Sequence, residues 1–307
     1  MLVSVIMLTY NHEKFISKAI EGVLAQKTNF LFELIIANDH STDRTEEIIK
    51  KYRNNNRETV KGYFNHKNIG PKKNFIKAYE VTKGKYVAMC EGDDFWTDPN
   101  KLQKQVDFLE NNSEYSICFH NVEILDDRGA KVERDRLFDK EKRDYHKNEL
   151  LFGKYLPTPS LLFRRYDLSN YYSIFSKVFN GDTLLLSILT QLGAAKYIDE
   201  ISPSVIIKHN NGIWSSKQDL EKWENNLNTY FQIYKILNPK LKEEYFIFFK
   251  KSYGFAIHKS ITDNNKRYKL KFLLKYILFL LRNKKFGPSL FLIRNFNNKE
   301  IINYFII

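Results

Sequence analysis

The stretch "LVSVIMLTYNHEKFISKAIEGVLAQ", residues 2–26, begins with an apolar run typical of a buried strand and continues into a helix-like segment at 13–26. The same alternation follows with the strand-like runs "FELIIA", "VKGYF" and "KYVAMC" and the helix-like segments 43–57, 71–82 and 98–111. Repeats of this length predict parallel strand–helix–strand units. We therefore predict an α/β fold with a mostly parallel sheet buried between helices on both faces.

Polar segments follow each of the strand-like runs. They are "TYNH" (9–12), "NDHSTD" (38–43), "HKNIG" (66–70) and "EGDD" (91–94). In open α/β sheets, ligands bind beyond the carboxyl ends of the strands. The sequence therefore predicts that these four segments converge on a binding site at one edge of the sheet.

The pattern changes after residue 114. The segment "YSICFHNVEILDDRGAKV" (115–132) is typical of a hairpin turning at 126–129, and a polar loop is expected over 133–148. Further strands are predicted in "PTPSLLFRR" and "PSVIIKH", on either side of a helix that starts near Asp182. Beyond Trp214 the pattern is helical. We expect one domain over 1–215 and a helical, basic region over 216–307.

The overall composition is that of a globular protein. Hydrophobic residues make up 43% and charged residues 28% of the chain, which excludes a wholly disordered or collagen-like protein. The two cysteines lie inside strand-like runs, so we expect packed thiols in a reducing compartment. The start of the chain lacks the features of a signal peptide and is predicted to be the first strand.

The net charge of +13 is concentrated at the end of the chain. Residues 250–307 carry 13 Lys and Arg against 2 Asp and Glu, whereas residues 1–249 carry 36 against 34. The apolar core of the basic stretch 270–296 is about ten residues long, and a bilayer span needs roughly twenty. This region is expected either to lie on an anionic membrane surface or to dock on its own domain or a partner chain, which leaves an oligomer open.

Nucleic acid is not an expected partner of the basic region. Basic residues interleaved with aromatic ones can track phosphates and stack on bases. The region is too apolar for that role, however, and no nucleic-acid motif accompanies it. The expected location is cytoplasmic, with peripheral contact to the inner face of the cell membrane as one alternative.

Three acidic residues, Glu91, Asp93 and Asp94, follow the apolar run "YVAMC". A short acidic loop can be an ordinary solvated turn. Clustered carboxylates repel one another unless a cation neutralises them, and oxygen ligands suit Mg²⁺ or Mn²⁺. Gly92 would let the backbone approach a ligand closely. Because the cluster is expected at the ligand edge of the sheet, the pattern favours a metal site.

Two other acids have simple structural interpretations. Asp98 precedes Pro99 and a helical pattern, which predicts an N-cap followed by proline at the first helical position. Asp43 precedes "RTEEIIKKY" and is expected to cap the next helix or to lie in its first turn.

Six motifs occur in an order that resembles family 2 inverting glycosyltransferases with the GT-A fold, of the bacterial surface-polysaccharide type. The resemblance covers roughly residues 1–215. The motifs are "SVIMLTYNHEKFISKAIEGVLAQ", "ELIIANDHSTDRT", "KNIGPKKNFIKAY", "YVAMCEGDDFWTDPNKLQKQ", "NGDTLLL" and "IIKHNNGIWSS".

The resemblance implies roles for the acidic residues. Asp93 would be the main carboxylate ligand of Mn²⁺ or Mg²⁺, and Glu91 and Asp94 would contact the ribose or the sugar of the donor. Glu91 departs from the family, in which Asp is commoner at this position. Asp39 would recognise the nucleoside, since a carboxylate accepts hydrogen bonds from base or ribose. The family usually has two successive acids at this point, and this chain departs from it with Asn38 directly before Asp39.

Neighbouring polar residues would complete the donor pocket by the same resemblance. Thr9, Tyr10 and Asn11 would line the nucleotide, and they can at the same time form a polar loop that caps the following helix. Asn68 and Asn74 would belong to a loop that reaches the donor. The intervening lysines, 72 and 73, are compatible either with a phosphate contact or with solvated side chains.

The resemblance also places the catalytic base and a second metal ligand. Asp182 would deprotonate the acceptor hydroxyl, with an N-cap as its structural alternative. His209 would complete the metal site or contact the diphosphate, because neutral imidazole is a reasonable Mn²⁺ ligand. Trp214 is a candidate wall of the acceptor site.

The expected function is a metal-dependent inverting hexosyl- or N-acetylhexosaminyltransferase. Its donor would be a nucleoside-diphosphate sugar, with a UDP-sugar as the leading candidate. Its acceptor would be a saccharide or lipid-linked saccharide. A composition rich in Lys, Asn and Ile suits an AT-rich bacterium, and surface polysaccharide synthesis is the setting by family analogy. The alternative is a non-catalytic subunit with the same fold that acts as a scaffold in a membrane-associated assembly.

Overall fold

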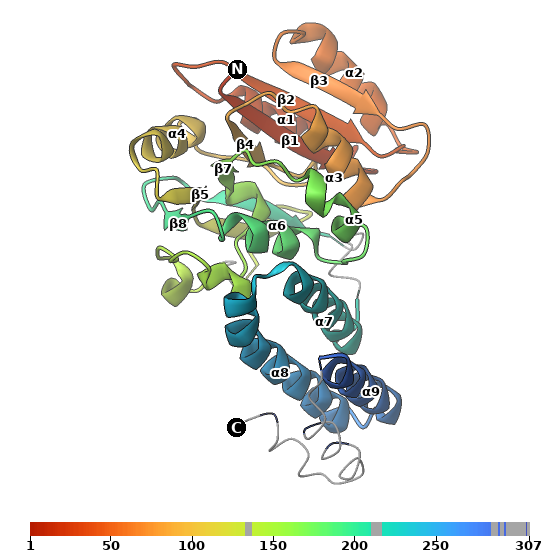
Figure 1. The fold of residues 1–307 in the computed structure, drawn as a ribbon. Coiled ribbons are helices and arrows are strands. Elements are labelled where there is room, and N and C mark those ends of the chain that lie inside the picture. The colour runs from red at the N-terminus through yellow and green to blue at the C-terminus, as the bar shows by residue number, and fades with distance from the viewer. Residues whose placement is uncertain (133–136, 210–216, 284–287, 289–291, 293–304, 306–307) are drawn as a thin grey trace. The chain divides into compact units, whose positions relative to one another are not determined.

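The chain forms two compact units in a computed structural model that describes residues 1–132, 137–209 and 217–283 together with residues 288, 292 and 305 (Figure 1). The sheet unit comprises Met1–Ser176 and Gly181–Asn210, and the helical unit comprises Lys177–Asn180 and the described part of Asn211–Ile307. The predicted boundary near residue 215 falls outside the described residues.

The sheet unit is built on a seven-stranded sheet, as the alternating pattern predicts. Its strand order is β3-β2-β1-β4-β7-β5-β8, and only β7 runs antiparallel to its neighbours. The strands are β1 Val3–Thr9, β2 Phe32–Asn38, β3 Val60–Phe64, β4 Tyr86–Met89, β5 Tyr115–Phe119, β7 Leu162–Arg164 and β8 Ala194–Tyr197. A separate parallel pair is formed by β6 Val122–Asp126 and β9 Ser204–Lys208.

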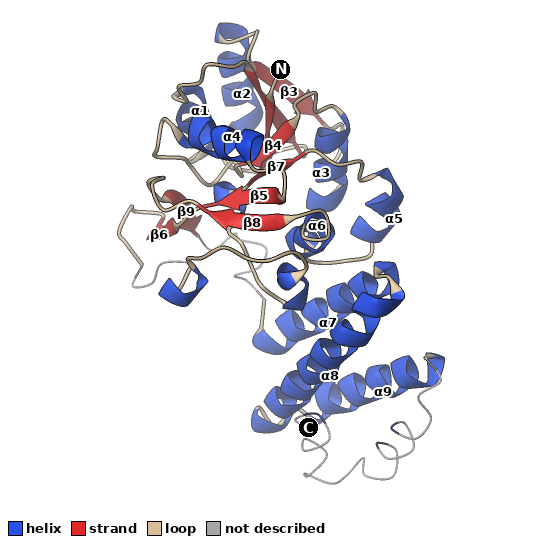
Figure 2. Cartoon of the chain, turned by 60° about the vertical axis from the view of Figure 1, so that its left-hand side comes forward, coloured by secondary structure: helices blue, strands red, loops and turns tan. Residues whose placement is uncertain are grey.

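Helices cover both faces of this sheet (Figure 2). One face carries α1 Ile16–Leu24, α2 Thr45–Asn55 and α4 Lys101–Asn111, and the other carries α3 Pro71–Glu80 and α6 Gly181–Leu189, with the short α5 Tyr172–Phe175 beside α3. Alternate residues of β1 are fully buried in the core under α1 and α4. Burial on both faces explains why the strands are continuous apolar runs.

The register of the parallel strands places their polar ends at one edge, as predicted. Thr9 at the end of β1 pairs with Asn38 at the end of β2, and Asn38 pairs with Phe64 at the end of β3. The backbone of β4 continues along β1, where the Gly92 amide donates to the Leu8 carbonyl at 2.9 Å. The segments 9–12, 38–43 and 91–94 therefore lie side by side.

The predicted hairpin over 115–132 is only partly correct. A tight turn does form, because the Gly129 amide donates to the Asp126 carbonyl at 3.0 Å and the Ala130 amide to Asp126 Oδ1 at 2.8 Å. The chain on the two sides of this turn does pair, because Leu125 and Lys131 form an antiparallel bridge and the Val132 amide donates to the Ile124 carbonyl at 2.8 Å. The earlier part of the segment lies outside the hairpin, since β5 joins the large sheet, and β6 pairs in addition with β9. Turn residues predict where the chain reverses and leave the partner of each strand open.

The start of α4 also differs from the prediction. The helix begins at Lys101, so Pro99 is not its first residue. Asp98 Oδ1 accepts a hydrogen bond from the Asn100 amide at 2.8 Å, and Asp98 Oδ2 accepts from Lys104 Nζ at 2.9 Å and from the Ser202 amide at 3.1 Å. Asp98 thus links the approach to α4 with the chain before β9. Although burial opposes it, this bonding lowers the pKa of Asp98.

Asp43 acts at the start of α2, close to the predicted role. Its Oδ1 accepts from the Thr45 amide at 3.0 Å, and its Oδ2 accepts from the Glu13 amide at 3.1 Å. One carboxylate therefore serves the first turn of α2 and the loop before α1.

The helical unit contains α7 Asp219–Ile236, α8 Pro239–Thr262 and α9 Lys266–Arg282, as its pattern predicts. Asn238 caps α8 and Asn265 caps α9 through their side-chain oxygens. Its core is aromatic, with the Phe249 and Phe279 rings 4.7 Å apart at their centroids. No helix in the described residues has the combination of length and apolar character that a bilayer span requires.

Candidate active site

The site begins where β4 ends, at the tight passage of the chain through Gly92. A Cβ atom added to Gly92 would lie 2.9 Å from Thr9 Cβ, from His12 Nδ1 and from Ile16 Cδ1. Real Cβ atoms essentially never make contacts this short. Glycine therefore allows the acidic segment to lie directly against the loop that follows β1.

Asp93 lies between two histidines from different parts of the chain. His209 Nε2 is 3.0 Å from Asp93 Oδ2, and His12 Nε2 is 3.7 Å from the same oxygen. The Phe15 ring packs on the His209 ring with their centroids 5.1 Å apart. The structure thus brings together Asp93 and His209, the two residues expected to bind the metal.

The charges of this pair stabilise each other. The hydrogen bond to Asp93 raises the pKa of His209, although burial opposes it. Burial alone would raise the pKa of Asp93, but the His209 hydrogen bond and the nearby imidazoles lower it overall. His12 behaves differently, because burial outweighs Asp93 and lowers its pKa.

The two flanking carboxyl groups are held in an unfavourable environment. Burial, followed by the charge of Asp93, raises the pKa of Glu91 to about 8. Burial, followed by the charges of Asp93 and Glu91, raises the pKa of Asp94 well above its usual range. Asp94 Oδ1 accepts from the Ile207 amide at 3.3 Å. In contrast, no hydrogen-bond partner for the buried Glu91 Oε2 is found among the described residues.

Asp182 lies in the first turn of α6, which begins at Gly181. Its Oδ1 accepts from the Thr183 amide at 2.7 Å. Its charge is one of the causes that raise the pKa of Glu91, so the two carboxyl groups are within electrostatic reach. Lys72 Cγ lies 3.8 Å from the position of a Cβ on Gly181, and burial lowers the pKa of Lys72. The start of α6 thus faces the acidic segment and Lys72.

Asp39 is almost fully buried and is bonded on both oxygens. Its Oδ1 accepts from Asn65 Nδ2 at 3.1 Å and from the Ile69 amide at 2.9 Å, and its Oδ2 accepts from the Gly70 amide at 2.8 Å. Gly70 adopts a left-handed φ of 83°. Asp39 therefore fixes the loop between β3 and α3 as well as standing at the predicted nucleoside position.

Asn11 connects the loops that follow β1 and β2. Its backbone amide donates to Ser41 Oγ at 2.9 Å, and its side-chain Oδ1 accepts from the backbone amide of Thr42 at 2.8 Å. Its φ of 57° is left-handed, a conformation that asparagine tolerates better than most residues. Tyr10 beside it is 44% exposed. The buried Thr9 Oγ1 has no hydrogen-bond partner within the described ranges.

The predicted asparagines differ in their surroundings. Asn74 is buried, donates to the Ala37 carbonyl at 2.8 Å and accepts from Asn65 Nδ2 at 2.8 Å. Asn68 is exposed and accepts from the Gly70 amide at 3.2 Å. Asn74 therefore stabilises the interior behind the loop, whereas Asn68 lies on its surface.

Asn38, the departure from the family pattern, has protein partners. Its Oδ1 accepts from Ser41 Oγ at 2.5 Å, and its Nδ2 donates to Glu46 Oε2 at 3.4 Å. Asn38 therefore supports the loop after β2. Trp214, the predicted acceptor wall, lies outside the described residues.

The donor atoms at the acidic segment fit a divalent cation. Within the described residues, no group of three or more His, Cys, Asp or Glu side chains is arranged to hold a metal by itself. Carboxylate oxygen and imidazole nitrogen nevertheless suit Mn²⁺, and Asp93 and His209 present both. The buried Glu91 Oε2 and His12 Nδ1, each unpaired within the described part of the chain, indicate a site that a ligand would complete.

Sequence reasoning missed two residues of this site, His12 and Asn65. His12 belongs to "TYNH", the polar end of the first strand, so its place at the ligand edge was the available signal. Asn65 directly follows β3 and binds both Asp39 and Asn74. No motif distinguishes Asn65 from other asparagines in the chain.

Comparisons with known proteins agree with this architecture. The family described as Glycosyl transferase family 2 matches residues 4–171. An uncharacterized protein of Mycobacterium bovis is 36% identical over 215 residues, which cover 69% of this chain and 60% of that protein. An uncharacterized glycosyltransferase of Methanocaldococcus jannaschii is 33% identical over 129 residues, 42% of this chain and 44% of that protein.

Two solved structures share the fold at low sequence identity. S. aureus TarS in complex with UDP-GlcNAc superposes with a TM-score of 0.67 at 18% identity, over 90% of this chain and 81% of that one. The mannosyltransferase PcManGT of Pyrobaculum calidifontis, in complex with GDP-Man and Mn²⁺, superposes with a TM-score of 0.57 at 13% identity. This match covers 99% of this chain and 84% of that one. These matches confirm the predicted GT-A fold.

The family match covers more than half of the chain, including the strand ends that carry the acidic segment and Asp39. The chain belongs to glycosyl transferase family 2.

Proposed function

We propose that this protein is a metal-dependent inverting glycosyltransferase that uses a nucleoside-diphosphate sugar as its donor, with a UDP-sugar as the leading candidate. The observation that carries the proposal is the arrangement at the end of β4, where Asp93 binds His209 and Glu91 Oε2 is buried without a partner among the described residues. A buried acidic cluster of this kind is costly unless a cation and its ligand complete it.

The proposed reaction is a single displacement. An acceptor hydroxyl attacks the anomeric carbon as Asp182 takes its proton, and the bond from that carbon to the diphosphate oxygen breaks, leaving the electron pair on the diphosphate. Attack from the face opposite the leaving group inverts the configuration. A rigid mount at the start of α6 would hold Asp182 in line with the donor.

Asp93 and His209 would hold Mn²⁺ or Mg²⁺. When bound, the cation would neutralise charge on the departing diphosphate. Glu91 and Asp94 would then face the ribose or sugar of the donor, and Lys72 would contact a phosphate. TarS and PcManGT, of the same fold, have been solved with UDP-GlcNAc and GDP-Man. The proposal therefore covers both hexosyl and N-acetylhexosaminyl transfer.

Residues at the ends of β1 and β2 would form the nucleoside side of the pocket. Thr9 is the last residue of β1, and Tyr10 and Asn11 follow it. Asp39 directly follows the last residue of β2. The acceptor would be a saccharide or lipid-linked saccharide in bacterial surface polysaccharide synthesis, with the protein on the cytoplasmic side of the membrane. Family membership and the GT-A fold support this setting by analogy.

A thermal-shift panel tests the donor assignment. The protein is heated with UDP-glucose, UDP-GlcNAc and GDP-mannose, each with and without Mn²⁺. Ligand binding to the native state raises the melting temperature, so one donor should stabilise the protein only with Mn²⁺ present. Absence of any Mn²⁺-dependent shift would argue against the metal-dependent site.

Donor hydrolysis separates an enzyme from a scaffold. Glycosyltransferases that bind donor and metal can transfer the sugar slowly to water, so nucleoside diphosphate should accumulate without any acceptor. Binding without hydrolysis, by contrast, would support the non-catalytic alternative.

A further inference from the structure

Helix α9 presents a row of exposed leucines. Leu270, Leu274, Leu278 and Leu281 are 44%, 47%, 53% and 38% exposed. Spacings of four, four and three residues place them along one side of the helix. We call these four residues the leucine stripe. The side chains of the opposite face, among them Phe272, Tyr276 and Phe279, are buried in the helical unit.

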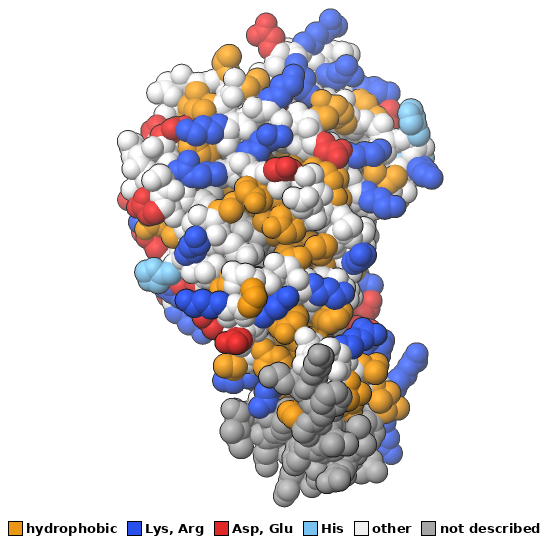
Figure 3. Space-filling view, viewed as in Figure 1, with side chains coloured by type: hydrophobic (Ala, Val, Ile, Leu, Met, Phe, Trp, Pro, Cys, Tyr) orange, Lys and Arg blue, Asp and Glu red, His pale blue; other side chains and the backbone are white. Residues whose placement is uncertain are grey.

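The same helix is strongly basic. Residues 266–282 contain six Lys and Arg and no Asp or Glu. At 3.6 residues per turn, Arg267 lies in line with the leucine stripe, Lys271 flanks it on one side and Lys266 flanks it on the other. Figure 3 shows hydrophobic side chains reaching the surface next to Lys and Arg side chains in the region of α9.

Only part of this charge is neutralised within the helical unit. Glu224 of α7 receives both Lys271 Nζ, at 2.5 Å, and Lys275 Nζ, at 2.7 Å. In the described part of the chain, Lys266, Arg267 and Lys269 form no ion pair. Lys266 and Arg267, which lie beside the leucine stripe, therefore leave that side of α9 with a positive excess.

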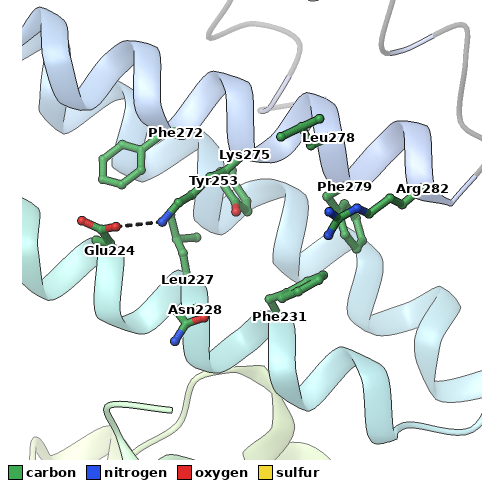
Figure 4. Close-up of a pocket in the computed structure, with 10 residues that line it drawn as sticks. All are labelled: Glu224, Leu227, Asn228, Phe231, Tyr253, Phe272, Lys275, Leu278, Phe279 and Arg282. Atoms are coloured by element: carbon green, nitrogen blue, oxygen red, sulfur yellow. Dashed lines mark hydrogen bonds and ion pairs between the residues drawn. The ribbon is translucent and has the colours of Figure 1, made fainter. Parts of the chain in front are cut away.

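A cavity of about 200 Å³ opens at the end of the leucine stripe (Figure 4). Leu278 and Arg282 of α9 line it, together with Phe231 of α7 and Phe279. Arg282 extends beside Phe279, and Glu224 reaches Lys275 at the other end of the cavity. The described residues form no ion pair with Arg282 either. Apolar surface next to an unneutralised cation thus continues from the leucine stripe into the helical unit.

We propose that the leucine stripe and its basic flanks dock the protein on an anionic membrane surface. Leucine side chains would enter the boundary between headgroups and acyl chains, while Lys and Arg would meet lipid phosphates. None of the described helices can span the bilayer, so the contact would be peripheral.

Charge decides between a membrane and the other candidate occupants. A second copy of the chain would bring the same basic face against itself, and like charges in contact are unfavourable. Nucleic acid would match the cations but would leave four leucines in water at the interface. An anionic bilayer satisfies both the positive charge and the apolar row.

Vesicle sedimentation of the full chain tests the proposal without any sugar nucleotide, so its result does not depend on the proposed transferase activity. The vesicles contain either phosphatidylcholine alone or equal parts of phosphatidylcholine and phosphatidylglycerol. We expect partitioning onto the anionic vesicles to be about tenfold higher, and to fall with added salt because screening weakens the attraction. Equal binding to both vesicles would overturn the proposal.

Two sets of substitutions locate the contact. Leu274→Gln with Leu278→Gln should reduce partitioning by about tenfold, and Lys266→Gln with Arg267→Gln and Lys269→Gln should reduce it on anionic vesicles only. The matched control is Leu31→Gln in the sheet unit, where the leucine is 74% exposed, and it should bind as the wild type does. Wild-type binding by both sets would contradict the proposal.

Light scattering provides the opposing result. A wild-type dimer that the leucine variant converts to a monomer, in a protein that does not bind anionic vesicles, would replace the membrane with a second copy. Because the substituted side chains are exposed or, at Lys269, half-buried, circular dichroism should show the same helix content and a closely similar melting temperature for all variants.

Discussion

The two units of this protein keep their charged side chains in different places. The sheet unit buries charged groups of both signs, among them Asp39, Asp94, Asp98 and Lys101. In the described part of the helical unit, the buried polar residues are all neutral: Thr229, Gln232, Ser252 and Ser260. Burying a charge is costly without a partner. The sheet unit offsets buried charge with hydrogen bonds, as at Asp39 and Asp98, whereas the helical unit leaves its described charged side chains partly or fully exposed.

The largest expected effect concerns Asp182, the proposed base at the start of α6. Asp182→Asn should lower donor turnover by roughly 10²- to 10⁴-fold, the range for loss of a general base. Donor binding in the thermal-shift assay should stay close to that of the wild type. Asp107→Asn, on the exposed surface of α4, is the matched control and should retain full turnover. Turnover unchanged in Asp182→Asn would remove the base assignment.

The next effect concerns the acidic segment itself. Asp93→Asn keeps the side-chain shape but loses the charge that faces His209. Loss of an outer-sphere partner costs roughly 10- to 100-fold in metal affinity, and loss of a direct ligand should weaken Mn²⁺-dependent donor binding by more than that. Isothermal titration with and without Mn²⁺ measures it. Asp98→Asn removes a buried structural carboxylate instead, and it should lower the melting temperature while leaving the Mn²⁺ response intact.

A pH-dependent effect is expected from the buried cation Lys101. Its Nζ donates to Gln105 Oε1 at 2.8 Å and lies 4.1 Å from the centre of the Trp96 ring. Burial lowers the pKa of Lys101 from 10.5 to about 7. Between those two values the unfolded chain binds more protons than the folded chain, so this group makes stability rise with pH from about 7 to about 10.5.

Lys101→Met should remove most of this dependence. For one proton the slope is at most about 1.4 kcal/mol per pH unit, and we expect a total of roughly 2–4 kcal/mol across the window. Urea unfolding at a series of pH values measures it. Lys240→Met, in the helical unit, removes an exposed lysine and should leave the profile unchanged. If both variants flatten the profile equally, the contrast between the two units fails.

The smallest expected effect concerns the carboxylate that is fully bonded. Asp39→Ala would leave the Ile69 and Gly70 amides without their acceptor and should cost about 1–3 kcal/mol in the free energy of unfolding. Asn68→Ala, which removes an exposed acceptor on the same loop, should cost less than about 0.5 kcal/mol. Equal losses would show that Asp39 does not hold the loop.

The sequence predicted the parts of the fold that depend on local pattern. The continuous apolar runs that became β1 and β2 are typical of strands buried on both faces, and their polar ends lie at one edge because parallel strands align their carboxyl ends. The pairing of β6 with β9 could not be predicted, since it joins segments about 80 residues apart and no local signal specifies it.

The candidate site shows the same division. Asp93 and His209 could be named because each belongs to a recognisable motif. The bonds that Asp39 makes to the Ile69 and Gly70 amides involve main-chain groups, which every residue carries, so no sequence pattern distinguishes them. His12 likewise becomes visible only when the close passage of Gly92 brings it beside Asp93.

That passage also limits how this site can change during evolution. A single added methyl group at position 92 would press on three residues of the β1 loop and α1 at once, so the acidic segment and the start of the chain must vary together or not at all. In the proposed donor site, exposed positions such as Tyr10 and Asn68 can change with less disturbance, because Tyr10 meets solvent and Asn68 would lose only its bond from the Gly70 amide. Directed libraries should start there and leave Gly92 fixed.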